Sequence, residues 1–291
     1  MNGLRIAVTD DMLNEIARCI GSRPGFWTRV DSDRVRIRIL PVLIVAIVLL
    51  LGAFCAVLHF NEQRRVSLVR TLTTERVQAA IEAQLKSDAA IMSAALKPIS
   101  LDEKLLKALE AQDKASLLTR AKPLFECLKA EHQITHFYFH RVDRTNLLRV
   151  HKLQLFDDKI DRESLKIAET TGLPGTGLEQ GPTGNCTLRV VYPARIGTRL
   201  VGYVELGKEF EAIARKVHEL LDVHIIVAID KKLLEKDKWD NRNKFVGRQS
   251  AWSDYPDAVI IDATLPEPPQ TVNEILSRNR MPRNDDLAVS A

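Results

Sequence analysis

The side chains best suited to binding a small molecule lie in two short segments near the middle of the chain. Residues 134–140 read Ile-Thr-His-Phe-Tyr-Phe-His, and this alternation predicts a strand with polar rings on one face and phenylalanines on the other. A turn through residues 143–146 leads to a second predicted strand, residues 147–151. The side chains that we expect to share a face on each strand are His136, Tyr138 and His140 on the first, and Leu147, Arg149 and His151 on the second.

Two arginines within predicted strands, Arg149 and Arg189, indicate what this face would bind. A buried guanidinium needs an anionic partner, because an unpaired buried charge is costly. That partner is either a carboxylate or phosphate of a ligand, or a carboxylate of the chain such as Glu179, Glu205 or an aspartate of residues 157–161. We predict a small anionic ligand. The predicted ligand-binding residues are Tyr138, His140, Arg149, His151, Glu179 and Arg189.

Other chemistry is poorly supported by the sequence. His136 and His140 are four residues apart, which on a strand separates them by roughly 13 Å, too far to share one metal ion. Residues 175–181 lack the spacing of a dinucleotide fingerprint, and we expect the glycine-rich segment 172–184 to form a flap over the pocket. No hydrolase, kinase or cyclase motif is present. We therefore expect no enzyme, no cofactor and no metal; a hydrolase using His140 and His151 is the weaker alternative.

The surrounding elements predict an α+β fold. Two more strands are expected at residues 187–192 and 200–206, with helices at 162–171 and 210–221. An antiparallel sheet with its helices on one side fits this order. Further strand-like runs at residues 224–230 and 258–262 and a short helix at 271–278 are too few for a complete second module.

A membrane-spanning helix is predicted near the N-terminus. Residues 39–60 carry no charge and are long enough to cross a hydrocarbon core of roughly 30 Å. A buried core helix and a cleaved signal peptide are the alternatives, although the run begins far from Met1 and no small-residue cleavage site follows. The cluster Arg34-Val-Arg-Ile-Arg38 at the lipid boundary favours a cytoplasmic N-terminus.

A long helix is expected to leave the membrane. Residues 61–96 contain no Gly or Pro, and an apolar stripe recurs at steps of three and four along their second half: Ile81, Leu85, Ala89, Met92 and Leu96. We expect this half to pack on the domain and the half nearer the membrane to face a second copy, giving a homodimer. A helix wholly buried in its own domain is the alternative. A second helical stretch, residues 101–132, should be interrupted at Pro123.

The charge distribution and the cysteine spacing bear on nucleic-acid binding and on disulfide bonds. The chain has 42 basic and 38 acidic residues spread along its length, so no nucleic-acid-binding face is indicated. Its four cysteines lack a CxxC spacing, and only Cys127 and Cys186 would share an oxidising compartment. Either a disulfide or two free buried thiols would fit.

The segment from His136 to Asp230 resembles the double Cache sensory domains of bacterial sensor kinases, nucleotide cyclases and chemoreceptors. The resemblance implies an extracytoplasmic, PAS-like, usually dimeric sensor that binds a small molecule and moves a helix across the membrane. The matching segments are residues 136–140, 148–151, 158–162, 177–179, 181–182, 188–193, 202–207 and 252–262.

The likeness is incomplete, because the family carries two modules, a second membrane helix and an output domain. The chain is therefore expected to be a C-terminally truncated sensor without its own output domain, set in the bacterial inner membrane with its main domain in the periplasm. A ligand-independent membrane protein that dimerises with a full-length receptor is the alternative. The expected parts are a cytoplasmic tail (1–38), the transmembrane helix (39–60), a helical region (61–132), a membrane-distal module (133–221), a partial second module (222–270) and a polar tail (271–291).

Overall fold

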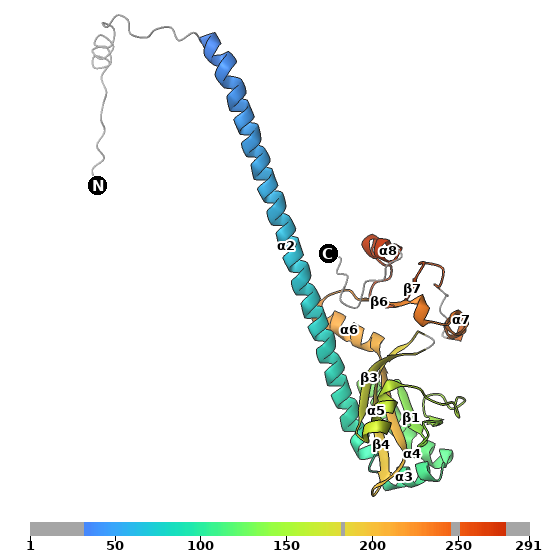
Figure 1. The fold of residues 1–291 in the computed structure, drawn as a ribbon. Coiled ribbons are helices and arrows are strands. Elements are labelled where there is room, and N and C mark those ends of the chain that lie inside the picture. Colours follow the sequence, from blue (N-terminus) through green and yellow to red (C-terminus); the bar gives the residue numbers. More distant parts are fainter. Residues whose placement is uncertain (1–31, 182–183, 246–250, 278–291) are drawn as a thin grey trace, which may run out of the picture. The chain divides into compact units, whose positions relative to one another are not determined.

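The structure is a computed structural model that describes residues 32–181, 184–245 and 251–277 (Figure 1). The chain divides into two compact units, Met1–Ser67 and Leu68–Ala291. The expected tail before residue 32 and the end of the chain after residue 277 lie outside the described residues.

Helix α2, Ser32–Ile99, is one continuous helix and contains the predicted membrane span. It begins seven residues before the uncharged run at Ile39, because the arginine-rich segment in front continues the helix. Within the described residues it is the one helix long and apolar enough to cross a membrane, and its apolar window is fully exposed in the isolated chain. Exposed leucines, isoleucines and valines on every side of a helix are typical of a lipid-facing segment.

The end of α2 belongs to the second unit and packs on its apolar core, as the apolar stripe predicted. Met92 and Leu96 are completely buried, and Leu85 and Ala89 pack against the same core. One ion pair accompanies these contacts, between Asp88 of α2 and Lys208 of the sheet, with an O–N distance of 2.8 Å. Residues Val66, Leu68, Val69 and Leu72, nearer the membrane segment, are exposed.

Two shorter helices follow, α3 (Glu103–Glu110) and α4 (Lys114–His132). Each begins at an aspartate, Asp102 or Asp113, whose carboxylate accepts two backbone N–H groups of the first turn. The prediction of a break at Pro123 was wrong: Pro123 lies inside α4, and the chain breaks at residues 111–113 instead. The aspartate cap, a stronger local signal than the proline, sets the start of α4.

The main sheet is antiparallel, with the strand order β2-β1-β5-β4-β3. Its strands are β1 (His136–His140), β2 (Asn146–Arg149), β3 (Gly175–Gln180), β4 (Cys186–Ile196) and β5 (Arg199–Glu209). The α+β prediction is confirmed. The expectation that residues 172–184 form a flap was wrong, since β3 lies in this segment and pairs with β4 along its whole length.

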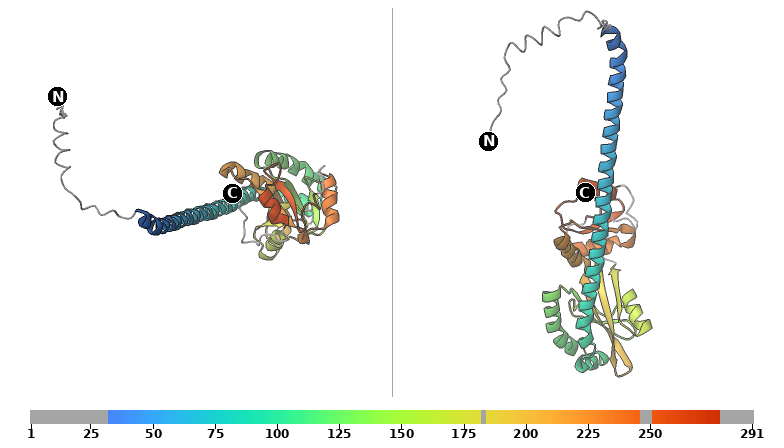
Figure 2. Two further views of the ribbon diagram at one scale, coloured as in Figure 1. Left: turned by 90° about the horizontal axis from the view of Figure 1, so that it is seen from above. Right: turned by 90° about the vertical axis from the view of Figure 1, so that its left-hand side faces the viewer.

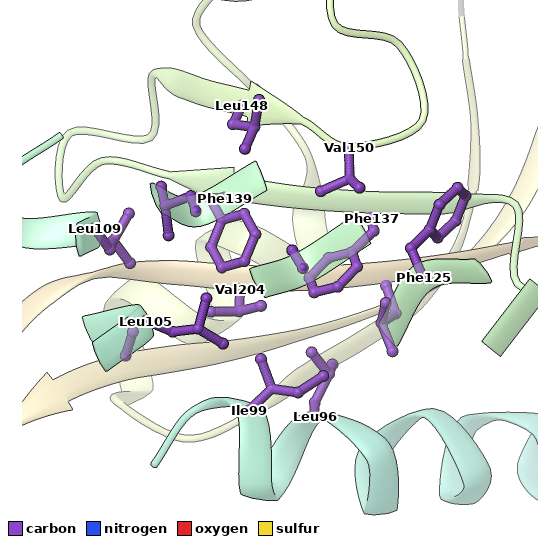
Figure 3. Close-up of a cluster of buried hydrophobic side chains, with 14 of the residues drawn as sticks. Leu96, Ile99, Leu105, Leu109, Phe125, Phe137, Phe139, Leu148, Val150 and Val204 are labelled. Atoms are coloured by element: carbon purple, nitrogen blue, oxygen red, sulfur yellow. The ribbon is translucent and has the colours of Figure 1, made fainter. Parts of the chain in front are cut away.

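The two faces of the sheet have different characters. Phe137 and Phe139 belong to the large apolar core with residues of α2, α3 and α4 and with Ile213 of α6 (Phe210–Leu221) (Figure 3). Helix α5 (Glu163–Thr171) packs on the other face through Leu165 and Ala168, so the helices are not on one side as expected; Figure 2 shows α4 and α5 on opposite sides.

The alternation predicted for the second strand fails at one residue. Phe139 pairs with Leu148 and His140 with Asn146, so Leu147 is the extra residue of a β-bulge. Leu147 packs into the apolar core instead of sharing a face with Arg149.

The remaining elements form a small second sheet of β6 (Ile226–Asp230) and β7 (Ala258–Ala263). The 3-10 helix η1 (Lys231–Leu233), α7 (Lys236–Phe245) and α8 (Gln270–Ser277) accompany it. Helix α7 was not expected from the sequence; its Trp239 is buried in the core of this sheet with Ile229, Val259 and Ile261.

Candidate ligand-binding site

The face of the main sheet opposite the phenylalanines carries a cluster of charged and aromatic side chains. Strand register builds it in two neighbouring rows. In one row Arg149, Tyr138, Glu205 and Val191 lie side by side on β2, β1, β5 and β4. In the next row His136, Gly207, Arg189 and Gly177 follow one another on β1, β5, β4 and β3. We call the charged and aromatic members of these rows the polar cluster, together with His140, His151, Arg162 at the start of α5 and Asp158 before it.

Glu205 is the central anion of the polar cluster. Its buried carboxylate accepts hydrogen bonds from Arg189 at 2.5 Å, from Arg162 at 2.8 Å and from His140 Nε2 at 2.9 Å. Burial alone would raise the pKa of Glu205, but the positive charges of Arg189 and Arg162 outweigh it and hold the pKa well below the usual range. Glu205 is therefore ionised, and His140 must donate from Nε2.

Tyr138 lies at the point where three guanidinium groups meet. The Cζ atoms of Arg162, Arg149 and Arg189 are 5.1, 5.4 and 5.6 Å from the centre of its ring. His136 and His140, two residues away on either side along β1, stack in parallel with the same ring. Distances below about 6 Å allow cation–π attraction, so the ring helps to hold the three cations together.

Arg149 is held by a fork-to-fork pair with Asp158. Its Nη1 and Nη2 donate to the two carboxylate oxygens at 2.7 and 2.6 Å, and Nη1 also donates to the carbonyl of Leu155. Hydrogen bonding from Arg149 lowers the pKa of Asp158. The backbone of Asp158 is fixed as well, because its carbonyl accepts from the N–H of Asn146. This is a preorganised structural ion pair.

The histidines of the polar cluster are neutral bases. Burial lowers the pKa of His151 to about 4 and lowers the pKa of His136 well below its usual value, and the nearby arginines add to both effects. Burial also lowers the pKa of His140, against an opposing effect of Glu205. The backbone N–H of Phe137 donates to His151 Nδ1, so the ring proton of His151 is on Nε2.

Glu179 joins the cluster from the edge strand β3. Its Oε1 accepts the backbone N–H of Ser164, in the first turn of α5, at 2.7 Å. Its Oε2 lies 3.5 Å from Arg189 Nε, which is an ion-pair contact but too long for a hydrogen bond.

The structure thus brings all six predicted residues into one place. For the two arginines it supplies internal carboxylate partners, the alternative that the sequence had left open. Sequence reasoning missed Arg162 and underrated Glu205. An acidic residue between Val204 and Leu206 in an apolar strand was the available signal for Glu205; Arg162, in a loop before a helix, offered none.

The polar cluster combines hydrogen-bond donors and acceptors. Among the described residues no group of three or more His, Cys, Asp and Glu side chains is placed to hold a metal ion. The thiols of Cys127 and Cys186 are free, and Cys127 is exposed rather than buried as predicted, because it faces outward from α4. Two buried arginines, the partly exposed Arg162 and three neutral histidines offer donors and acceptors of fixed direction.

A family of sensory domains matches this chain. Residues 72–252 match the dCache_3 family, described as a double sensory domain of two-component sensor kinase. No curated protein matches the chain significantly. Among solved structures, the Escherichia coli DcuS sensor domain is 12% identical, with 47% of this chain and 98% of that one covered and a TM-score of 0.41.

Two further sensor structures are similar. The Vibrio cholerae histidine kinase DctB sensor domain is 20% identical, with 53% of this chain and 65% of that one covered and a TM-score of 0.37. The V. cholerae LuxQ periplasmic domain is 15% identical, with 54% and 74% covered and a TM-score of 0.39.

Proposed function

The chain belongs to the dCache_3 family of double sensory domains, and from this premise we propose that it is a membrane-anchored periplasmic sensor of a small anionic metabolite. The N-terminus is cytoplasmic, α2 crosses the inner membrane once, and the domain after it contributes to transmembrane signalling by binding the ligand rather than by catalysis. The observation that carries the proposal is the convergence of three guanidinium groups on the ring of Tyr138.

Arg162 is the arginine best placed to meet a ligand. Its side chain is 22% exposed, compared with 9% for Arg149 and 3% for Arg189. Among the described residues its guanidinium donates one hydrogen bond, to Glu205, whose charge is also neutralised by Arg189. Arg162 can therefore turn one edge of its guanidinium to an incoming anion while Glu205 keeps a cationic partner, and a guanidinium binds carboxylate or phosphate through two parallel bonds.

The helix after the membrane span supports a homodimer. Val66, Leu68, Val69 and Leu72 are exposed in the single chain. Apolar side chains at such spacing on a helix are usually covered by a partner helix in water. We therefore propose that a second copy packs here, and that ligand binding alters this contact.

Ligand binding is tested with the full-length chain in detergent, by thermal unfolding in a panel of carboxylates, phosphates and amines. A ligand at about 100 times its Kd should stabilise the protein by about 2.7 kcal/mol. Arg162→Gln should weaken the shift, and Arg195→Gln, an exposed arginine on β4, is the matched control. If acids and phosphates all leave the melting temperature unchanged, the proposal is wrong. In that case membrane crosslinking to a full-length receptor, independent of ligand, would support the interaction protein instead.

The membrane topology has a separate test. A tagged chain should stay with the membrane in alkaline carbonate, and its second unit should be cleaved by protease added to spheroplasts. Release by carbonate, or protection from the external protease, would contradict the proposed anchoring and orientation.

A further inference from the structure

Three buried polar atoms have no hydrogen-bond partner among the described residues and belong to residues in contact with one another: Arg189 Nε, Glu179 Oε2 and Ser164 Oγ. The first two are 3.5 Å apart, beyond hydrogen-bonding distance. Ser164 is linked to Glu179 because its backbone N–H donates to the other carboxylate oxygen. Most buried polar atoms in proteins are hydrogen-bonded. Three that are not, in residues that are neighbours in space, indicate a place for a further polar group.

Gly177 leaves room beside two of these three residues, Glu179 and Ser164. It pairs directly with Arg189 across β3 and β4. A Cβ built on Gly177 would lie 3.5 Å from Glu179 Oε1 and 3.9 Å from the Cβ of Ser164, which are ordinary contact distances. The side chain that this glycine lacks would therefore stand next to both residues without a clash.

The chemistry of the three atoms selects the group that would satisfy them. Arg189 Nε can only donate, and a carboxylate oxygen such as Glu179 Oε2 accepts. An ammonium group cannot accept from the arginine, and a second carboxylate would repel Glu179. A hydroxyl group accepts from one and donates to the other, and it can also bond to the hydroxyl of Ser164. We propose that the ligand is a hydroxylated anion whose hydroxyl binds beside Gly177, between Arg189, Glu179 and Ser164. This inference rests on the proposed function and adds the class of ligand.

The test compares pairs of anions that share a carbon skeleton and an anionic group and differ only in their hydroxyl groups, by one hydroxyl in the two smallest carboxylate pairs. The Kd of the full-length chain in detergent is measured for glycolate against acetate, lactate against propionate, gluconate against hexanoate, and glycerol 3-phosphate against propyl phosphate. Because hydrogen bonds to charged groups are the stronger ones, the hydroxylated member of the bound pair should bind about 10- to 100-fold more tightly. The phosphate pair distinguishes a phosphate anchor from a carboxylate one.

Two variants locate the hydroxyl. Gly177→Ala puts a methyl group in its place, and Ser164→Ala removes one of its partners; both should reduce the preference and leave the binding of the deoxy analogue in place. Thr176→Ala, at an exposed neighbouring position on β3, is the matched control and should keep the preference.

The outcomes separate this inference from the proposed function. Equal affinity for both members of a bound pair overturns the hydroxyl assignment and leaves an anion sensor. A preference that survives both Gly177→Ala and Ser164→Ala overturns the location. Binding of no compound overturns both.

Discussion

The ion pair between Asp88 and Lys208 gives a prediction about how α2 is held on the sheet. Asp88 is on α2 and Lys208 is on β5, and their side chains are 5% and 8% exposed. Gln84 also donates to the second carboxylate oxygen of Asp88, at 3.0 Å. In Asp88→Ala, the ammonium group of Lys208 would remain at the helix–sheet contact without its anion, which is the costly way to break a buried pair.

Removing one partner of a buried ion pair typically lowers the free energy of unfolding by about 3–5 kcal/mol. For a unit of this size each kcal/mol corresponds to about 2–4 °C, so Asp88→Ala should lower the melting temperature by about 6–20 °C. The assay is thermal and urea unfolding of the full-length chain in detergent, followed by circular dichroism. The double variant Asp88→Leu, Lys208→Met should be far less destabilised than Asp88→Ala, since well-packed apolar replacements of buried pairs are often neutral.

Lys86→Ala is the matched control, because Lys86 is exposed on the same helix turn. It should change the free energy of unfolding by no more than about 0.5 kcal/mol. A loss of less than about 1 kcal/mol in Asp88→Ala, or a double variant as unstable as the sum of the two single variants, would refute the reasoning.

Three further predictions concern other parts of the chain. The pKa of His151 is about 4 in the folded protein and about 6.5 in the unfolded chain, so the unfolded chain binds the proton first as pH falls and stability is lost between these two values. In His151→Gln, the free energy of unfolding should fall less over this pH range, by up to about 3 kcal/mol. An unchanged dependence of the free energy of unfolding on pH would contradict this. The φ angle of Gly184 is +80°, and a Cβ at this position would lie 2.6 Å from the indole of Trp239. Gly184→Ala should therefore change Trp239 fluorescence and destabilise the second sheet by about 1–3 kcal/mol. Unchanged fluorescence and stability would contradict the packing of Gly184 against Trp239. Asp102→Ala should cost about 1 kcal/mol in urea unfolding through loss of the α3 cap, and a neutral result would mean that the cap is redundant.

Local patterns predicted the elements that are determined by local physics. Alternation in residues 136–140 placed Phe137 and Phe139 in the core and the polar rings on the opposite face, and the structure confirms both. The apolar stripe of α2 correctly predicted burial of Met92 and Leu96. In each case one repeating pattern, alternation in a strand or steps of three and four in a helix, decides which side chains are buried, so distant contacts need not be known.

Elements that depend on distant partners were missed. β3 is glycine-rich and resembles a loop in sequence, but it becomes a strand because β4 offers it a complete ladder of backbone partners. The close contact of Gly175 with α5 shows why a glycine is needed there: a Cβ would lie 1.9 Å from the carbonyl oxygen of Ser164. The bulge at Leu147 likewise follows from pairing with β1, which the period of one strand cannot reveal.

In the candidate site, too, the sequence could not identify partners that are distant along the chain, here the carboxylates that pair with the arginines. Sequence composition required anions for Arg149 and Arg189, but it could not decide between a ligand and the chain. Asp158 lies nine residues from Arg149, whereas Glu205 lies 16 residues from Arg189 and 43 from Arg162. Because the fold brings these carboxylates in, a ligand does not have to neutralise bare arginines. The affinity for the proposed ligand would come from donors and acceptors that make no hydrogen bond within the described residues, and Arg189 Nε and Glu179 Oε2 are two of them, 3.5 Å apart.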